Sequence, residues 1–186
     1  MVCSVSSPNA DAKLSFNWLA LGEASDDLVA MRCAIYGGEL AWVSQEDASF
    51  AWDAYDRVST ALVVRDAAAR LVASGRLTIE HDGPLEVSDL VDWKGALPPD
   101  LRVATAAEWS RVMIAQSSRG GGLFRRMYKE AREAAKRRGA RLLAGASVAD
   151  LRPHYEALGF TYLDLPFRSS FFAASPVYFP AYQVIV

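Results

Sequence analysis

Apolar and polar residues alternate along several segments of this chain, a pattern typical of half-buried β-strands. One further segment, ARLLAGAS, is almost entirely apolar, as expected of a strand buried on both faces. Together these patterns predict seven strands, over residues 13–21, 60–66, 70–81, 104–115, 140–147, 160–165 and 177–186. The second and third strands flank a short polar tip, which predicts a β-hairpin.

Helical spacing of apolar residues marks three other segments. SDDLVAMRCAIY (25–36) opens on a serine cap, and LFRRMYKEAREAAKRRG (123–139) has one apolar face and ends on a glycine. A shorter helix is expected within 148–160, whereas HDGPLEVSDLVDWKGALPPD (81–100) predicts a long surface loop. Because no repeat or linker interrupts the pattern, it predicts a single α/β domain over residues 1–186.

Composition narrows the class of protein without naming it. The chain is 52% hydrophobic and 23% charged, which suits one globular domain. Cys3 and Cys33, with two histidines, are too few for a disulfide framework or a zinc site, so we expect reduced thiols and no metal. The sequence shows no leader and no apolar run long enough to cross a bilayer, which favours a cytoplasmic protein without a membrane partner.

Charge is unevenly distributed although its net value is only −2. Residues 119–141 hold nine basic side chains and two acids, a net of +7, and residues 1–60 hold nine acids and three basic side chains, a net of −6. Two interpretations are open at this point. The asymmetry indicates a partner of opposite charge, or it reflects two solvated faces of opposite sign.

Three consecutive glycines, Gly120 to Gly122, join the fourth predicted strand to the basic helix. Such a turn directs unsatisfied backbone N–H groups and the positive end of the helix dipole at one spot, which suits a phosphate group. Neither the Walker motif nor the dinucleotide motif is matched. A plain strand-to-helix turn, with glycines for flexibility, is the alternative.

The order of strand, RGGG turn, helix, strand and short helix with YEALGF resembles the GNAT superfamily of N-acetyltransferases. The resemblance implies a mixed, mostly antiparallel seven-stranded sheet flanked by helices, with a central strand, glycine-rich turn and helix. It also implies an acyl donor that is acyl-CoA or the phosphopantetheine of an acyl carrier protein. The donor-binding positions that it implies are Arg119, Gly120, Gly121, Gly122 and Leu123, with the backbone near Val112 and Ile114. The motif's sixth position, Gly or Ala in the family, is Phe124 here.

A narrower resemblance covers the N-terminal two thirds. In order and approximate spacing, ten positions are similar to the signature of acyl-homoserine-lactone autoinducer synthases: Arg32, Tyr36, Trp42, Asp53, Tyr55, Asp56, Arg76, Glu108, Ser110 and Arg111. The C-terminal third, with YEALGF, is more similar to ordinary acyltransferases or to the long-chain N-acyl amino acid synthases. The implied reaction is attack of an amine on a thioester carbonyl.

Two residues are candidates for the proton transfers of that reaction. Glu108 lies mid-strand among apolar residues, where desolvation would raise its pKa and suit it to accept the ammonium proton. Half of a buried ion pair with Arg111 or Arg32 is the alternative role. Tyr155 falls where many acetyltransferases keep a tyrosine that protonates the leaving thiolate, or it is a core residue with its hydroxyl at the rim.

Acceptor binding is implied for another set of charged residues. The candidates are Arg32, Asp53, Asp56, Arg76 and Arg111, together with Trp42 in the pocket wall. The carboxylates and arginines suit the amino and carboxyl ends of an amino acid or of S-adenosylmethionine. A salt-bridge network that only fixes the N-terminal segment is the alternative.

The basic residues of the helix predicted over 123–139 indicate how the acyl donor could be recruited. Its cations are Arg125, Arg126, Lys129, Arg132, Lys136, Arg137 and Arg138. Positive charge beside a phosphopantetheine site would steer an acidic acyl carrier protein, whereas the low pI of about 5.7 and the lack of a nucleic-acid motif argue against nucleic acid. An aminoacyl-tRNA donor stays open.

The sequence therefore predicts an N-acyltransferase that moves an acyl group from a carrier-bound or CoA thioester to the amine of a small amino-acid-like acceptor. Neither cysteine lies near the motif, so direct transfer is expected. The alternatives are an ordinary acetyl-CoA-dependent acetyltransferase and a non-catalytic module that binds CoA or an acyl thioester.

Overall fold

A computed structural model of the chain describes residues 14–21, 25–43, 51–169 and 174–186. Its strands are β1 (Ser15–Ala20), β2 (Ser59–Arg65), β3 (Leu71–Ile79), β4 (Ala106–Ile114), β5 (Leu142–Val148), β6 (Thr161–Tyr162), β7 (Phe167–Arg168) and β8 (Val177–Val184). Its α-helices are α1 (Asp26–Arg32), α2 (Glu86–Leu90), α3 (Pro99–Arg102), α4 (Leu123–Arg137) and α5 (Arg152–Glu156). Shorter helical turns are η1 (Cys33–Glu39), η3 (Asp56–Val58), η4 (Gln116–Ser118) and η5 (Ala149–Leu151).

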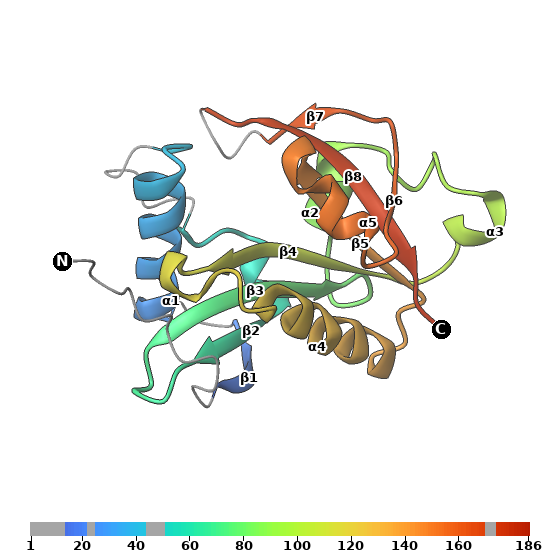
Figure 1. Cartoon of the computed structure of the whole chain (residues 1–186). Coiled ribbons are helices and arrows are strands. Elements are labelled where there is room, and N and C mark those ends of the chain that lie inside the picture. Colours follow the sequence, from blue (N-terminus) through green and yellow to red (C-terminus); the bar gives the residue numbers. More distant parts are fainter. Residues whose placement is uncertain (1–13, 22–24, 44–50, 170–173) are drawn as a thin grey trace.

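The strands form one mixed sheet in the order β1-β2-β3-β4-β5-β8-β6, with β7 paired to β8 (Figure 1). Every pairing is antiparallel except that of β4 with β5. The predicted mixed, mostly antiparallel sheet is confirmed. It has eight strands and not seven, because the segment expected to be a loop before β8 contributes the two-residue strand β7.

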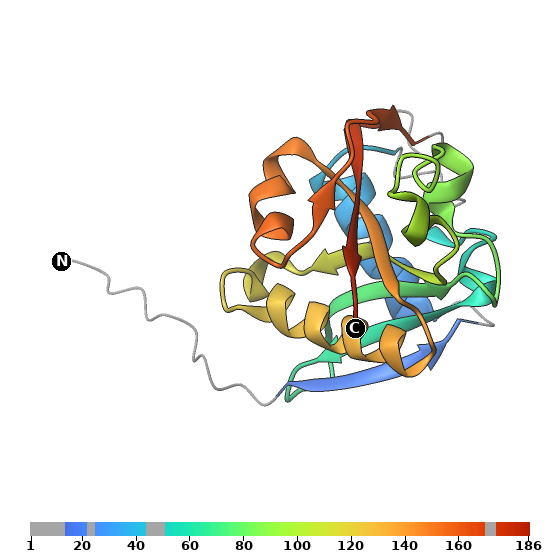
Figure 2. The same ribbon diagram turned by 90° about the vertical axis from the view of Figure 1, so that its right-hand side faces the viewer.

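Helices cover both faces of this sheet. Alternate residues of a strand point to opposite faces, and in β2 Leu62 and Val64 pack with Leu123 and Met127 of α4, whereas Ala61 and Val63 pack in the cluster that contains α1. Figure 2 shows α4 and α1 on the two sides of the sheet. The predicted apolar face of α4 is thus the buried one, and its basic residues face outward.

Two segments differ from the prediction. The helix expected over 25–36 is α-helical only through Arg32 and continues as the wider π-helix η1. The segment 81–100 is not simply a surface loop, because it forms α2 and packs Leu85, Val87 and Trp93 into a cluster against β4 and β5. A short helix with few residues leaves little periodic signal, which is why the pattern missed it.

The remaining expectations concern the thiols, membrane-spanning segments and the number of domains. Cys33 is a free thiol, and Cys3 lies outside the described residues. Among the residues that the structure describes, no helix has both the length and the apolar character needed to cross a membrane. The single-domain reading of residues 1–186 stays a prediction.

Candidate active site

The parallel strands β4 and β5 separate in the middle of the sheet. Their pairing consists of Ala106 with Leu142, Ala107 with Leu143 and Glu108 with Ala144, although β4 runs on to Ile114 and β5 to Val148. Beyond Glu108, the two strands therefore diverge and leave a gap between their facing edges. The sequence alone gives no sign of this divergence, since it depends on strands that are distant along the chain.

A β-bulge lies in β4 at the start of the divergence. Ser74 pairs with Met113 and Arg76 pairs with Ser110, so Arg111 and Val112 both lie opposite Gly75. Arg111 has a φ of 51°, a left-handed conformation that is costly for a residue with a side chain. Bulges redirect side chains at functional sites, and this one places Arg111 at the gap.

A cavity of about 390 Å³ occupies the gap. Residues 109–112 of β4 line one side of it, and residues 146–148 of β5 line the other. Its remaining wall combines aliphatic, polar and aromatic residues, and the rings of Tyr36, Trp42, Tyr178 and Phe167 contact one another in series. Centroid separations of 5.7 to 5.9 Å join consecutive rings. Trp42 is therefore in the pocket wall, as the sequence predicts.

Glu108 is the last paired residue of β4 before the gap, and it lines the cavity. Its side chain is buried, and Oε2 accepts a hydrogen bond of 3.3 Å from the amide of Val87. Burial, followed by the negative charge of Glu86, raises the pKa of Glu108 to about 7. Such a carboxylate can accept a proton near neutral pH.

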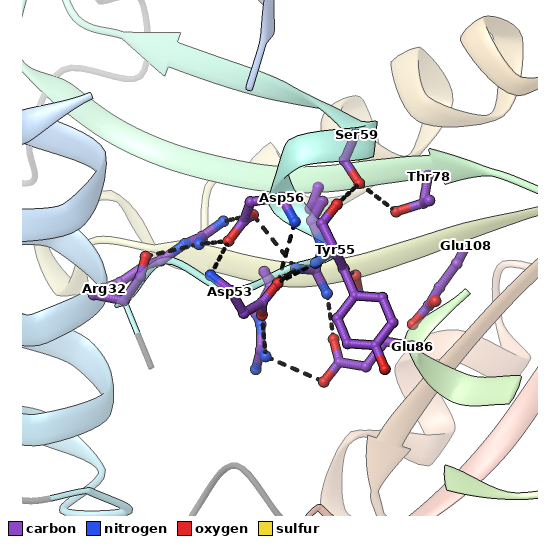
Figure 3. A network of polar contacts seen from close by, with 12 residues as sticks. Arg32, Asp53, Tyr55, Asp56, Ser59, Thr78, Glu86 and Glu108 are labelled. Atoms are coloured by element: carbon purple, nitrogen blue, oxygen red, sulfur yellow. Dashed lines mark hydrogen bonds and ion pairs between the residues drawn. The ribbon is translucent and has the colours of Figure 1, made fainter. Parts of the chain in front are cut away.

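A buried ion network lies beside Glu108 (Figure 3). Arg32 binds Asp56 through two bonds of 2.7 and 2.8 Å, and Arg76 binds Asp53 at 2.7 Å. Arg111 in turn binds Asp53 at 2.8 Å. The five residues that the sequence assigns to the acceptor thus bind one another, the arrangement that the alternative interpretation describes.

Only part of that network reaches the cavity. Arg111 lines it, whereas Arg32 and Asp56 are 1% and 0% exposed and lie behind it. The ion pairs attach the segment that contains η3 to β3 and β4, because Asp53 also accepts hydrogen bonds from the amides of Tyr55 and Asp56. The network therefore fixes the orientation of Arg111 at the gap.

Glu86, in α2, is a cavity residue that the sequence pattern does not predict. Its carboxylate binds Arg76 and, at 3.1 Å, Arg111, and it lines the cavity. The sequence signal is an acid directly flanked by two apolar residues, Leu85 and Val87. That signal is weak, because a surface loop tolerates the same pattern.

Tyr155 lies in α5 on the β5 side of the cavity, which it lines. Its ring is buried against Phe124 and Phe160, with centroids 5.3 and 5.4 Å away. Burial raises the pKa of Tyr155, so its hydroxyl keeps its proton at neutral pH. Glu108 and Tyr155, the two predicted proton-transfer residues, thus face one cavity.

The glycine turn lies at the N-terminus of α4, next to the end of β4. Gly120 and Gly122 have φ angles of 86° and 72°, a region that favours glycine, and a side chain at either position would meet no neighbouring atom. The backbone is thus open to a phosphate group at the positive end of a 15-residue helix. These glycines fit the pyrophosphate of coenzyme A or the phosphate of phosphopantetheine.

Of the other candidate donor-binding residues, one lines the cavity and two have structural contacts instead. Arg119 bonds Glu39 and, at 3.0 Å, the carbonyl of Ile114, so its side chain braces the turn against η1. Val112 lines the cavity, whereas Leu123 packs in the core. The departure at Phe124 has a structural explanation, because its ring packs on Tyr155.

The basic face of α4 is partly engaged within the protein. Arg138 pairs with Asp82, Arg132 pairs with Glu133, and Arg126 lies 4.7 Å from the centroid of Phe16. Arg125 and Lys129 are exposed. They are four residues apart and so lie on one side of the helix.

Comparisons with known proteins bear on the fold. No protein-family model matches the chain, and no curated protein does. Solved structures match over nearly the whole chain. The structure of BjaI, a CoA-dependent acyl-homoserine lactone synthase solved with SAM and isopentyl-CoA, is 19% identical and has a TM-score of 0.70, with 94% of this chain and 84% of that chain covered.

Two other similar structures are an N-acyl amino acid synthase and an N-acyltransferase by name. FeeM, an N-acyl amino acid synthase from uncultured soil microbes, is 12% identical with a TM-score of 0.69, covering 94% of this chain and 92% of that one. An acyl-CoA N-acyltransferase from Pseudomonas aeruginosa is 17% identical with a TM-score of 0.64, covering 92% of this chain and all of that one. These likenesses confirm the expected fold.

Proposed function

We propose that the protein is an N-acyltransferase that passes an acyl group directly from a thioester to the amine of a small acceptor. The observation that carries the proposal is the position of Glu108, a buried carboxylate with a pKa near 7 at the point where β4 and β5 diverge. A base of this pKa suits deprotonation of an ammonium group near neutral pH. The fold shared with acyltransferases supports the same reaction class.

The proposed reaction uses the residues around the cavity in sequence. Glu108 accepts a proton from the acceptor's ammonium group, and the neutral amine attacks the thioester carbonyl. Backbone amides of β4 near Val112, where β4 no longer pairs with β5, stabilise the oxyanion that forms. The C–S bond then breaks as Tyr155 donates its proton to the departing thiolate, and the surplus proton on the new amide nitrogen is released through solvent and restores the Tyr155 hydroxyl. No covalent intermediate on the protein is required.

We propose that the donor enters over the glycine turn. The space beside Gly120, Gly121 and Gly122 is open at the start of α4, and the turn follows the end of β4, whose residues 108–112 line the cavity. Acyl-CoA and the phosphopantetheine arm of an acyl carrier protein both carry a phosphate group at one end and the thioester at the other. The exposed Arg125 and Lys129 beside the turn favour a carrier protein, whose acidic surface they would attract.

The acceptor proposed here is an amino acid or S-adenosylmethionine-like amine. Arg111 is the network cation that lines the cavity, and the other four residues of the network position it. The aromatic wall of Tyr36, Trp42, Tyr178 and Phe167 would contact the acyl group or the acceptor side chain.

Thiol release measures this function. Acetyl-CoA, long-chain acyl-CoA and acylated carrier protein would each be offered with a panel of amino acids and S-adenosylmethionine. We expect release with at least one long-chain donor, and its loss in Glu108→Gln. Preference for acetyl-CoA would identify an ordinary acetyltransferase and contradict the expected long-chain donor. Donor binding without any turnover would identify a binding module and contradict the proposed reaction.

A further inference from the structure

Two carboxylates approach the cavity from different elements. Glu108 comes from β4, and Glu86 comes from α2, which the sequence pattern assigned to a surface loop. The amide of Val87, the residue after Glu86, donates a hydrogen bond to Glu108 at 3.3 Å. Both side chains line the cavity (Figure 3). The polar end of the cavity is therefore built around a pair of acids.

The surrounding charges are balanced without Glu108. Among the described residues of the network, the arginines are Arg32, Arg76 and Arg111, and the carboxylates that they bind are Asp53, Asp56 and Glu86. Three positive charges thus meet three negative ones. Glu86 forms ion pairs with two arginines, whereas an ionised Glu108 adds one negative charge that no ion pair of this network compensates.

A cation in the cavity would restore the balance. A buried charge is stable when a group of opposite sign lies against it, and hydrogen bonds from an ammonium to a carboxylate are among the stronger ones in proteins. An ammonium group has three N–H donors and can bind two carboxylates at once. The aromatic rings of Tyr36 and Trp42 line the same cavity and would contact the carbon chain that carries it.

We propose that Glu86 and Glu108 together bind the acceptor's ammonium group, with Glu86 as the fixed anion and Glu108 as the proton acceptor. The inference rests on the proposed function and adds a binding residue to it. The acceptor enters as a cation, R–NH₃⁺. One N–H bond breaks as its proton passes to the Glu108 carboxylate, which becomes neutral, and the resulting amine keeps a hydrogen bond to Glu86.

Binding of a simple cation tests the pairing without any turnover. Calorimetric titration of the full chain with n-butylammonium and with n-butanol compares a cation with a neutral molecule of similar shape. We expect the wild-type protein to bind n-butylammonium more tightly than n-butanol. Glu86→Gln should lower the affinity for n-butylammonium about tenfold or more and leave the affinity for n-butanol unchanged. Glu156→Gln is the control, because it removes an exposed carboxylate that pairs with Arg152 outside the cavity.

Equal affinity of the wild-type protein and a folded Glu86→Gln variant for n-butylammonium would overturn the inference. Should Glu86→Gln fail to fold, Glu86→Asp retains the charge and withdraws it by one methylene. Weaker n-butylammonium binding with unchanged n-butanol binding is expected of Glu86→Asp, and an unchanged preference would overturn the proposal. Cation binding that depends on Glu86, with no turnover of any thioester, would contradict the proposed function alone.

Discussion

Glu108 is ionised in the folded protein only at a cost in free energy. Its carboxyl group is buried beside Glu86, and both burial and that neighbouring charge favour the protonated form. Folding raises the pKa of this acid from 4.5 to about 7. The folded state therefore holds the proton over a pH range in which the unfolded chain releases it, and stability falls as the pH rises through that range.

Replacement of Glu108 by Gln should stabilise the protein in a pH-dependent way. Gln keeps the bond from Val87 and removes the charge. The gain in the free energy of unfolding should be small at pH 4.5, grow as the pH rises to 7, and level off at about 3 kcal/mol or less above it. Urea unfolding at pH 5 and pH 8 measures the difference. A gain of the same size at both pH values would contradict the raised pKa.

Tyr155→Phe should slow thiol release while leaving the fold intact. The variant keeps the ring contacts with Phe124 and Phe160 and loses only the hydroxyl that is proposed to protonate the thiolate. We expect kcat to fall about 100-fold, the effect typical of removing a general acid. Tyr128→Phe removes a hydroxyl outside the cavity lining and should retain activity. Equal rates for the two variants would exclude the role assigned to Tyr155.

At the scale of elements, the turn before α4 offers a matched pair of substitutions. Gly122 caps the helix with a φ of 72°, whereas Gly121 does not have positive φ, and both positions are open to a side chain. Gly122→Ala should therefore lower the free energy of unfolding by about 1 kcal/mol, and Gly121→Ala should leave it unchanged or slightly raised. Thermal unfolding compares them. If Gly121→Ala were destabilised and Gly122→Ala were not, the requirement for glycine at Gly122 would be wrong.

The elements also show what the sequence can predict. The largely apolar segment 104–115 predicts β4 and places Glu108 within it, because a residue between apolar neighbours on a strand has few alternatives to burial. The spacing of Leu123 and Met127 gave the buried face of α4 for the same local reason. The divergence of β4 from β5, the bulge at Arg111 and the burial of Glu86 depend on contacts between distant segments. No local pattern contains that information.

At the scale of the whole molecule, the distribution of charge gives a test that separates the two proposed kinds of donor. Arg125 and Lys129 are exposed on one side of α4, beside the glycine turn. The double variant Arg125→Glu with Lys129→Glu should lower kcat/KM for an acylated carrier protein at least tenfold and should change acyl-CoA turnover much less. Rates at low and high salt provide the control, since salt screens charge and should reduce the difference in kcat/KM between the wild-type protein and the double variant. Equal losses with both donors would argue against carrier docking.

The divergence of β4 and β5 gives the protein a sheet edge that lies inside the molecule. Exposed edges invite pairing with other chains, and proteins usually blunt or cover them. Here the part of β4 that does not pair with β5 lines a cavity whose wall also includes Tyr36, Trp42 and Tyr155 of α5. An extended ligand with amide groups could pair with this edge as a strand would. Hydrogen exchange of the amides of β4 should then slow when such a ligand binds, which makes the ligand part of the sheet.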